Sequence, residues 1–399
     1  MKHGELRLIA TCPEETKDVL IAELERLGVS HIEPAYRAVN FTASEEQFYQ
    51  AHLRLRTASR ILQVIKDVPA KSPEMLYSQA RRINWPDLFG VERTYLIEGV
   101  PGDRGREFMR ANDISKKVRE GLQDSFQRRV GRLPKVDLKE PKVIIVAFVA
   151  AGRAILSFDT SGKALHKRGY RQEGHPAPIK ETLAASLLLL AGYDGSQAFL
   201  DPMCGSGTIA IEAAMIALGK APQIHRPKGQ FQFEWLNSFN RDLWRQVQEE
   251  VRAERASEPS HAIIASDISP AYTALAKRNA LKARVEKHIG FATGRFQDID
   301  PPAETGILVT NLPYGERLAK ASRDELEQLY KEIGDTLKKR FPGWRAALLA
   351  AEESPYKSIG LKTTRRIPLM NGSIPCKLLI FDLYSGSRKL ARNPSTQLS

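Results

Sequence analysis

The first 70 residues alternate between short apolar runs and longer segments with helical periodicity. Period-two apolar positions predict strands, and apolar residues spaced by three and four predict helices. Short strands that alternate with helices are typical of a two-layer α+β module, so we expect a ferredoxin-like domain at 1–70. The predicted strands are 5–12, 38–44 and 61–68, and the predicted helices are 13–28 and 44–60.

Residues 71–162 show a second pattern of the same kind and predict a separate compact unit. It combines a helix at 75–83, a strand at 94–100, a long helix at 111–131 and a β-hairpin that turns at Ala151-Gly152. In the long helix, Ile114, Val118 and Leu122 recur at helical spacing and are predicted to face the core.

Basic residues are concentrated in this middle part of the chain. The net charge is +13, and residues 71–175 carry 21 Lys and Arg against 13 Asp and Glu. Such an excess indicates a surface that binds a polyanion such as RNA, although a basic helix face is also commonly just solvated. The candidate RNA contacts on the long helix and just after it are Lys116, Lys117, Arg119, Arg128, Arg129 and Arg132.

The stretch 163–180 is polar and basic, with two glycines and two prolines, and we interpret it as an interdomain linker. Lys167, Arg168 and Arg171 could bind phosphate there. They could equally brace the linker against acidic side chains.

Beyond the linker, apolar strands are separated by long helices, which predicts a doubly wound, Rossmann-like α/β domain at 181–390. The final strands form a hairpin that turns at Asn371-Gly372. We expect 391–399 to be a flexible tail. The predicted strands of this domain are centred on 198–201, 261–269, 288–296, 306–311 and 344–351.

The most informative element is Asp-Pro-Met-Cys-Gly-Ser-Gly-Thr, where a strand ends at Asp201 and a helix begins near Thr208. Glycines let the backbone approach a ligand, and the helix start offers free N–H groups. The spacing matches neither the dinucleotide fingerprint nor a P-loop. It fits S-adenosylmethionine, with Asp201 pairing with the amino group of the methionine moiety. The remaining turn residues in this predicted site are Met203, Cys204, Gly205, Ser206 and Gly207.

Two further acidic residues follow strands of the same domain. Asp267 ends the second strand and could accept both ribose hydroxyls of the cofactor. Asp298 follows the third strand and could accept a hydrogen bond from the adenine amino group, or could cap a helix instead.

Residues 307–309 are apolar and lead directly into Asn311-Leu312-Pro313-Tyr314. An exocyclic amino group on a base is a weak nucleophile because its lone pair is delocalised into the ring. The Asn311 side-chain oxygen and the Leu312 carbonyl could accept its two N–H groups, while Pro313 shapes the turn and Tyr314 stacks on the base. Catalysis would then depend on positioning and electrostatics.

An aromatic and charged insertion at 221–260 interrupts the domain. Its aromatic residues could stack bases, but their helical spacing favours packing of a helix onto the domain.

Several classes of protein fit the sequence poorly. No apolar run is long enough to span a bilayer, and the N-terminus lacks the apolar core of a secretory signal. Three widely spaced cysteines suit a reducing cytoplasm and offer no zinc-binding set, so we expect no metal. A cytosine-C5 methyltransferase would need a nucleophilic cysteine, and Cys376 lies far along the chain from the base-site motif.

Four strings together resemble the THUMP-domain class I RNA methyltransferases that make N2-methylguanosine. They are His166–Arg171, Leu200–Ala214, Thr310–Leu318 and Asn371–Phe381. The resemblance covers nearly the whole chain and is strongest to enzymes that modify large-subunit (23S) ribosomal RNA. It implies that 71–162 is a THUMP RNA-binding domain, that S-adenosylmethionine is the cofactor, and that Asn311 to Tyr314 form the target-base site. The common motif is Asn-Pro-Pro-Tyr, and Leu312 replaces its first proline.

Other functions remain open from the sequence. Transfer RNA is an alternative substrate within the same family. The same tetrapeptide also serves adenine-N6 methylation of DNA and glutamine methylation of proteins, although the basic middle unit favours RNA. A non-catalytic RNA-binding assembly factor is a different class of function, which the intact motifs disfavour.

Overall fold

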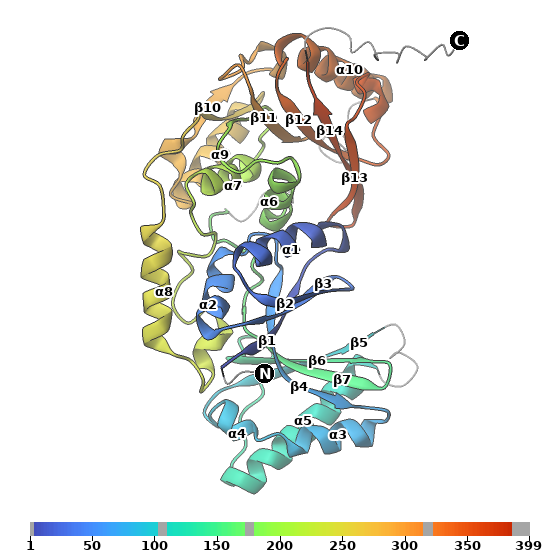
Figure 1. Cartoon of the computed structure of the whole chain (residues 1–399). Coiled ribbons are helices and arrows are strands. Elements are labelled where there is room, and N and C mark those ends of the chain that lie inside the picture. The colour runs from blue at the N-terminus through green and yellow to red at the C-terminus, as the bar shows by residue number, and fades with distance from the viewer. Residues whose placement is uncertain (1–3, 103–109, 172–178, 314–321, 385–399) are drawn as a thin grey trace, which may run out of the picture. The chain divides into compact units, whose positions relative to one another are not determined.

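The computed structural model describes residues 4–102, 110–171, 179–313 and 322–384, which form two compact units (Figure 1). We call them the N-terminal unit and the C-terminal unit. The N-terminal unit is built from residues up to Arg171, together with Lys180–Ser186 and Leu218–Ser257. The C-terminal unit contains the other described residues. The predicted tail at 391–399 lies outside the described part of the chain.

One seven-stranded sheet runs through the N-terminal unit, in the order β2-β3-β1-β4-β7-β6-β5. β4 (Arg60–Pro69) pairs antiparallel with β1 (Leu6–Thr11) on one side and with β7 (Arg153–Asp159) on the other. The two modules predicted from the sequence therefore share a sheet through β4. The remaining strands are β2 (Ser30–Ala35), β3 (Ala38–Ala43), β5 (Tyr95–Pro101) and β6 (Val143–Ala150).

The helices of this unit bury one face each. On α5 the three predicted inner residues, Ile114, Val118 and Leu122, are fully buried. The neighbouring helix α3 packs against α5, and Gly121 of α5 allows a close approach between them. The helices are α1 (Lys17–Arg26), α2 (Glu45–Arg54), α3 (Pro73–Arg82), α4 (Trp85–Leu88) and α5 (Ala111–Val130), with a short 3-10 helix at Glu14–Thr16.

Strand β2 was not predicted. It lies at the edge of the sheet and pairs only with β3 among the described residues. None of its six residues is buried, so no apolar alternation marks it in the sequence. An edge strand without a buried face carries little of the period-two signal on which sequence prediction relies.

The insertion at 221–260 belongs to the N-terminal unit as far as Ser257, although it lies within the range assigned to the catalytic domain from the sequence. Its helix α8 (Arg241–Ala253) lies beside α2 (Figure 1). The ring centroids of Trp244 and Tyr49 are 5.4 Å apart, as are those of Phe233 and Phe48. The aromatic side chains thus pack a helix, as their spacing indicated, but against the first domain.

The C-terminal unit contains a second seven-stranded sheet, in the order β10-β9-β8-β11-β12-β14-β13. The first five strands are parallel, and the last two form the predicted hairpin. The strands are β8 (Ala198–Asp201), β9 (Ile263–Asp267), β10 (Gly290–Thr293), β11 (Gly306–Asn311), β12 (Arg345–Ala351), β13 (Arg365–Asn371) and β14 (Ile374–Asp382). The helices are α7 (Thr208–Ala217), α9 (Pro270–Lys282) and α10 (Arg323–Arg340), with α6 (Glu181–Leu190) at the division between the units.

Helix α10 shows how local signals and packing combine. Ser322 caps it, and the Glu325 side chain returns a hydrogen bond to the Ser322 backbone, which forms a capping box. Gly334 sits in the buried middle of the helix, where a Cβ atom would lie only 1.8 Å from the Ile359 carbonyl oxygen. Close packing at this point therefore requires a residue without a side chain.

We expect Gly334→Ala to destabilise the protein by about 1–3 kcal/mol, the usual cost of overpacking. At an exposed helix position, a Gly-to-Ala change would stabilise the protein by about 1 kcal/mol. The sign of the change in the free energy of unfolding therefore reports the close contact between Gly334 and Ile359. Thermal unfolding followed by calorimetry measures the change in the free energy of unfolding. Asp335→Ala, at the exposed neighbouring position, is the matched control and should stay within about 0.5 kcal/mol of wild type. A stabilised Gly334→Ala variant would contradict the packing described here.

Candidate active site

The turn between β8 and α7 is held tightly by backbone contacts. The Cys204 N–H donates to the Ser266 carbonyl at 2.8 Å, and the Gly207 N–H donates to the Cys204 carbonyl at 2.8 Å. Gly207 has φ +80°, and a Cβ there would lie 2.8 Å from the Cβ of Ala276 on α9. Only glycine satisfies both the backbone conformation and this close approach. The turn therefore lies directly at the start of α7, as the sequence predicted.

Asp201, at the end of β8, is a buried carboxylate with one free oxygen. Its Oδ1 accepts a hydrogen bond of 2.7 Å from the Thr310 hydroxyl. Its Oδ2 is buried and has no hydrogen-bond partner among the described residues. Burial raises the pKa of the Asp201 carboxyl to about 7, against the lowering effect of Thr310 and the Met203 N–H. A buried carboxylate oxygen without a partner is costly unless a ligand supplies a donor.

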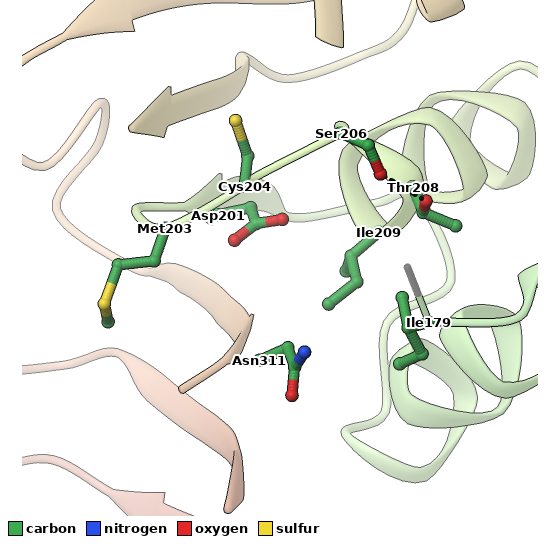
Figure 2. A pocket seen from close by; sticks show the side chains of 8 residues that line it. All are labelled: Ile179, Asp201, Met203, Cys204, Ser206, Thr208, Ile209 and Asn311. Carbon is green, nitrogen blue, oxygen red and sulfur yellow. Dashed lines mark hydrogen bonds between the residues drawn. The ribbon is translucent and has the colours of Figure 1, made fainter. Parts of the chain in front are cut away.

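Asn311, at the end of β11, faces the same small pocket as Asp201 (Figure 2). Its Oδ1 is also buried and without a partner in the described part of the chain. Because β8 and β11 are adjacent parallel strands, their carboxyl ends deliver the two side chains to one edge of the sheet. The other residues that line the pocket are Ile179, Met203, Cys204, Ser206, Thr208 and Ile209.

The residues that follow Asn311 are anchored from two directions. The Leu312 N–H donates to the Leu349 carbonyl at 2.9 Å, and the Leu312 side chain is fully buried. The carbonyl of Pro313 accepts a hydrogen bond of 3.2 Å from the hydroxyl of Tyr330 on α10. These contacts hold the backbone that carries the predicted acceptor groups. Tyr314, with Glu316 and Arg317, lies outside the described residues.

Asp267, at the end of β9, joins two turns at the carboxyl edge of the parallel strands. One carboxylate oxygen accepts the Gly205 N–H and the other accepts the Ser269 N–H, both at 2.9 Å. Each oxygen retains a second lone pair, so these contacts are compatible with the predicted bonds to ribose hydroxyls. The carboxylate therefore also orders the glycine turn.

Asp298 is exposed and is the last residue of a short 3-10 helix, Phe296–Asp298. An N-cap residue precedes the first turn of a helix, whereas Asp298 is the last residue of its helix. Asp298 is therefore not the N-cap of this helix. A contact between Asp298 and adenine stays a prediction.

Two positioning residues were missed from the sequence. Thr310 bonds Asp201, and the Asn279 side chain donates to the Ser206 carbonyl at 2.9 Å. A signal existed for both. Thr310 is a polar residue in an otherwise apolar strand, and Asn279 follows Leu275 and Ala276 on the buried face of α9.

The basic residues predicted to bind RNA all lie in the N-terminal unit. On α5, Lys116, Arg119, Arg128 and Arg129 are exposed, whereas Lys117 pairs with Glu120 at 3.4 Å. In the linker, Lys167 is exposed, but Arg168 donates to the carbonyls of Arg56 and Leu165, and Arg171 pairs with the buried Glu181 at 3.3 Å. Arg171 thus braces the linker against an acidic side chain, which was one of the two roles left open for it, whereas Arg168 is held by backbone carbonyls.

The three cysteines are buried and unpaired with one another. Burial raises the pKa of the Cys12 thiol to about 11 and raises the pKa of Cys204 well above its ordinary value. Cys376 is packed in β14, 2% exposed. These environments favour the thiol over the thiolate, so they do not favour nucleophilic catalysis by Cys12 or Cys204.

Within the described residues, no group of three or more His, Cys, Asp or Glu side chains could hold a metal ion. No described helix is long and apolar enough to cross a membrane.

Models of known families match three parts of the chain. Residues 7–62 match the RlmL ferredoxin-like domain, residues 70–159 match the THUMP domain, and residues 168–380 match the RMKL-like methyltransferase domain. The last match alone covers more than half of the chain.

Individual proteins are similar over nearly the whole chain. "Putative RNA methyltransferase slr0064" of Synechocystis is 33% identical over 94% of this chain and 96% of its own length. The ribosomal RNA large subunit methyltransferase K/L of Shewanella frigidimarina is 35% identical over 95% of this chain, which spans only 53% of that longer protein. The crystal structure of SMU.472 with S-adenosylhomocysteine superposes with a TM-score of 0.85 at 28% identity, covering 98% of this chain and 100% of that one.

The matched domains, the relatives and the pocket at the strand ends agree with one another. The chain therefore belongs to the RMKL-like methyltransferase family, as an S-adenosylmethionine-dependent enzyme with ferredoxin-like and THUMP domains before its catalytic domain.

Proposed function

We propose that this enzyme methylates the exocyclic N2 amino group of a guanosine in RNA, with large-subunit (23S) ribosomal RNA as the substrate. The observation that carries the proposal is the meeting of Asp201 and Asn311 in one pocket, each with a buried oxygen that has no partner among the described residues. Relatives named as ribosomal RNA large subunit methyltransferases support the choice of RNA, and they support a cytoplasmic location.

The residues around the glycine turn fit S-adenosylmethionine. We infer that Asp201 Oδ2, buried and without a partner among the described residues, accepts a hydrogen bond from the cofactor's amino group, and that the remaining lone pairs of Asp267 accept the ribose hydroxyls. Met203, Cys204, Ser206 and Thr208 line the pocket between the strand end and the first turn of α7. The bound cofactor supplies a methyl group on a positively charged sulfur.

Asn311 and Leu312 are suited to orient the target amino group. We infer that Asn311 Oδ1 and the Leu312 carbonyl accept its two N–H groups, which draws the nitrogen toward tetrahedral geometry and exposes its lone pair. The Tyr330 hydroxyl, through the Pro313 carbonyl, keeps this backbone in place. An amide is a poor base, so these residues contribute position and electrostatic stabilisation rather than proton abstraction. Tyr314 would provide the stacking face.

RNA is held, in this proposal, by the exposed cations of α5 and by Lys167 of the linker. Transfer RNA is the second candidate substrate, because the same site chemistry would serve a guanosine in either RNA. A non-catalytic binding role is disfavoured by the two convergent oxygens in the pocket, which an assembly factor would not need.

The direct test is methyl transfer from labelled S-adenosylmethionine to unmodified ribosomal RNA, transfer RNA and DNA, followed by nucleoside analysis. We expect N2-methylguanosine in large-subunit ribosomal RNA. The same nucleoside in transfer RNA alone would change the substrate and keep the chemistry. Label in DNA adenine, or no label in any nucleic acid, would refute the proposal.

In the same assay, Asn311→Ala should lower kcat/KM by at least about 100-fold, the usual effect of removing one preorganised polar contact to the reacting group. Binding of RNA and of S-adenosylhomocysteine should be nearly unchanged. Asn237→Ala, an exposed asparagine of the N-terminal unit, is the matched control. Wild-type turnover in Asn311→Ala would mean that Asn311 does not accept the amino group.

Cofactor affinity should rise with pH because of Asp201. Its pKa of about 7 means that the carboxyl is mostly protonated at pH 6 and mostly ionised at pH 8. Only the ionised form attracts the cationic amino group, so affinity for S-adenosylhomocysteine should increase about tenfold over this range. Isothermal titration calorimetry at pH 6 and pH 8 measures the affinity for S-adenosylhomocysteine. Asp201→Asn should bind weakly at pH 8 and lose the dependence, and a wild-type affinity that is flat with pH would exclude Asp201 as the partner.

Replacing Lys116, Lys117 and Arg119 together by Gln should weaken RNA binding. It should also reduce the slope of log affinity against log salt concentration by about 2–3, since each lost phosphate contact removes about one unit. Fluorescence anisotropy at several salt concentrations provides both values. The matched control replaces three exposed lysines of α10, Lys331, Lys338 and Lys339, by Gln. An unchanged affinity and slope would place the RNA-binding surface elsewhere.

A further inference from the structure

A basic groove in the insertion has no role in the site described above. It lies wholly within the N-terminal unit, has a volume of about 300 Å³, and is lined by residues between Arg226 and Arg252. Five of its lining residues are basic and one is acidic. The basic residues are Arg226, Lys228, Arg241, Arg245 and Arg252.

Helix α8 gathers three of these cations on one flank. Arg241, Arg245 and Arg252 are spaced by four and seven residues, which places them within an arc of about 40° on a helix with 100° per residue. The buried residues Trp244 and Val247 occupy a different face. The helix carries equal numbers of basic and acidic residues, so it is the arrangement of its arginines, not its net charge, that makes the groove basic.

The groove's exposed cations form no close ion pairs with described residues. Lys228, Arg241, Arg245 and Arg252 make no ion pair within 4.0 Å with any described residue. By contrast, Arg54 pairs with Glu254 at 2.7 Å in the same unit. Clustered cations that outnumber the nearby carboxylates raise the local positive potential and attract an anion.

The acidic residue in the groove, Glu234, is already engaged. Its carboxylate accepts the Gly229 N–H at 2.9 Å and the Phe231 N–H at 3.3 Å. Arg226 is engaged as well, because it donates to the carbonyls of Ser161 and Lys163 at 2.9 and 2.6 Å. These two residues therefore shape the groove, and the four remaining cations are the ones available to a ligand.

The helix that presents these cations is firmly held. Trp244 packs against Phe231 and Phe233, with ring centroids 5.6 and 5.1 Å apart, in addition to its contact with Tyr49 on α2. In Figure 1, α8 and α2 lie side by side in the N-terminal unit. A rigid helix lets the arginines bind with less loss of conformational entropy than a loop would.

We propose that this groove binds the sugar–phosphate backbone of the RNA substrate, as a contact surface additional to α5. The proposal rests on the proposed RNA methyltransferase function for the identity of the ligand. Guanidinium groups bind phosphate bidentately, and the three arginines extend along about 16 Å of helix, enough for several phosphates rather than one.

An acidic protein segment fits the groove less well. Protein partners usually insert apolar or aromatic anchors into pockets. Two of the three aromatic rings that line the groove are buried instead, with Phe231 2% and Trp244 7% exposed, and the third, Phe239, is half-buried. A phosphate backbone requires only positive charges, and the charged side chains are the exposed part of the groove.

The test replaces Arg241, Arg245 and Arg252 by Gln in the full chain and measures binding to an unmodified large-subunit ribosomal RNA transcript. We expect affinity to fall at least about tenfold near physiological salt and the slope of log affinity against log salt to decrease by about 2–3. Affinity for S-adenosylhomocysteine should remain at the wild-type value, which shows that the catalytic domain is intact. Unchanged RNA affinity and slope would overturn the proposal.

Two controls separate charge from structure. Replacing the same three arginines by Lys should retain most of the affinity and the slope, since the positive charges stay. Replacing Glu249 and Glu250, two exposed acidic residues of α8, by Gln should maintain or increase affinity. A loss of RNA binding in this second variant equal to that of the arginine variant would also overturn the proposal, because it would indicate damage to the helix.

The outcomes distinguish this inference from the proposed function. If wild type methylates RNA and the arginine variant binds it normally, the groove proposal fails alone. If wild type binds RNA through these arginines but methylates none of the RNAs offered, the groove proposal stands and the proposed function fails. Wild type that does not bind RNA would refute both.

Discussion

The Thr310 hydroxyl donates a hydrogen bond of 2.7 Å to the buried carboxylate of Asp201, and this contact joins the ends of two neighbouring parallel strands. Through it, β11 supports Asp201, while Asn311, the next residue on β11, faces the same pocket as Asp201. Adjacent residues of a strand point to opposite sides, so the two side chains serve different functions from one short segment. The proposed cofactor and base sites are thereby built on the same pair of strands.

The site keeps polar atoms buried that have no partner among the described residues, which is unfavourable in the free protein. The raised pKa of Asp201 is one consequence, because a buried carboxylate without a cation favours its protonated form. The surrounding contacts are correspondingly firm: the glycine turn is bonded to β9, Asp267 holds two backbone N–H groups, and Tyr330 holds the Pro313 carbonyl. Such preorganisation suits a reaction that depends on positioning rather than on a strong base.

The N-terminal unit is organised around a shared strand and an inserted helix. β4 belongs to the sheets of both predicted modules, so the ferredoxin-like and THUMP parts form one continuous structure. The insertion adds aromatic residues that pack on α2 and arginines that remain exposed. The same segment thus contributes both to the core of this unit and to a basic surface.

Local sequence patterns were sufficient for much of this protein. The strand β11, the capped helix α10, the buried face of α5 and the hairpin at Asn371-Gly372 follow from periodicity, caps and turn residues, which depend on near neighbours in the chain. The glycine turn also indicated S-adenosylmethionine as the cofactor, because that chemistry is encoded in a few adjacent positions, while the roles of the individual site residues stay predictions.

Tertiary structure alone decided the features that depend on distant residues. Thr310 could be assigned a partner only once β8 and β11 were known to be adjacent, and the two linker arginines required the positions of Arg56 and Glu181. The sharing of β4, the unburied edge strand β2 and the packing of the insertion on α2 leave no local signature. Sequence patterns record which face of an element is buried, whereas the identity of what covers it is settled by the contacts of the folded chain.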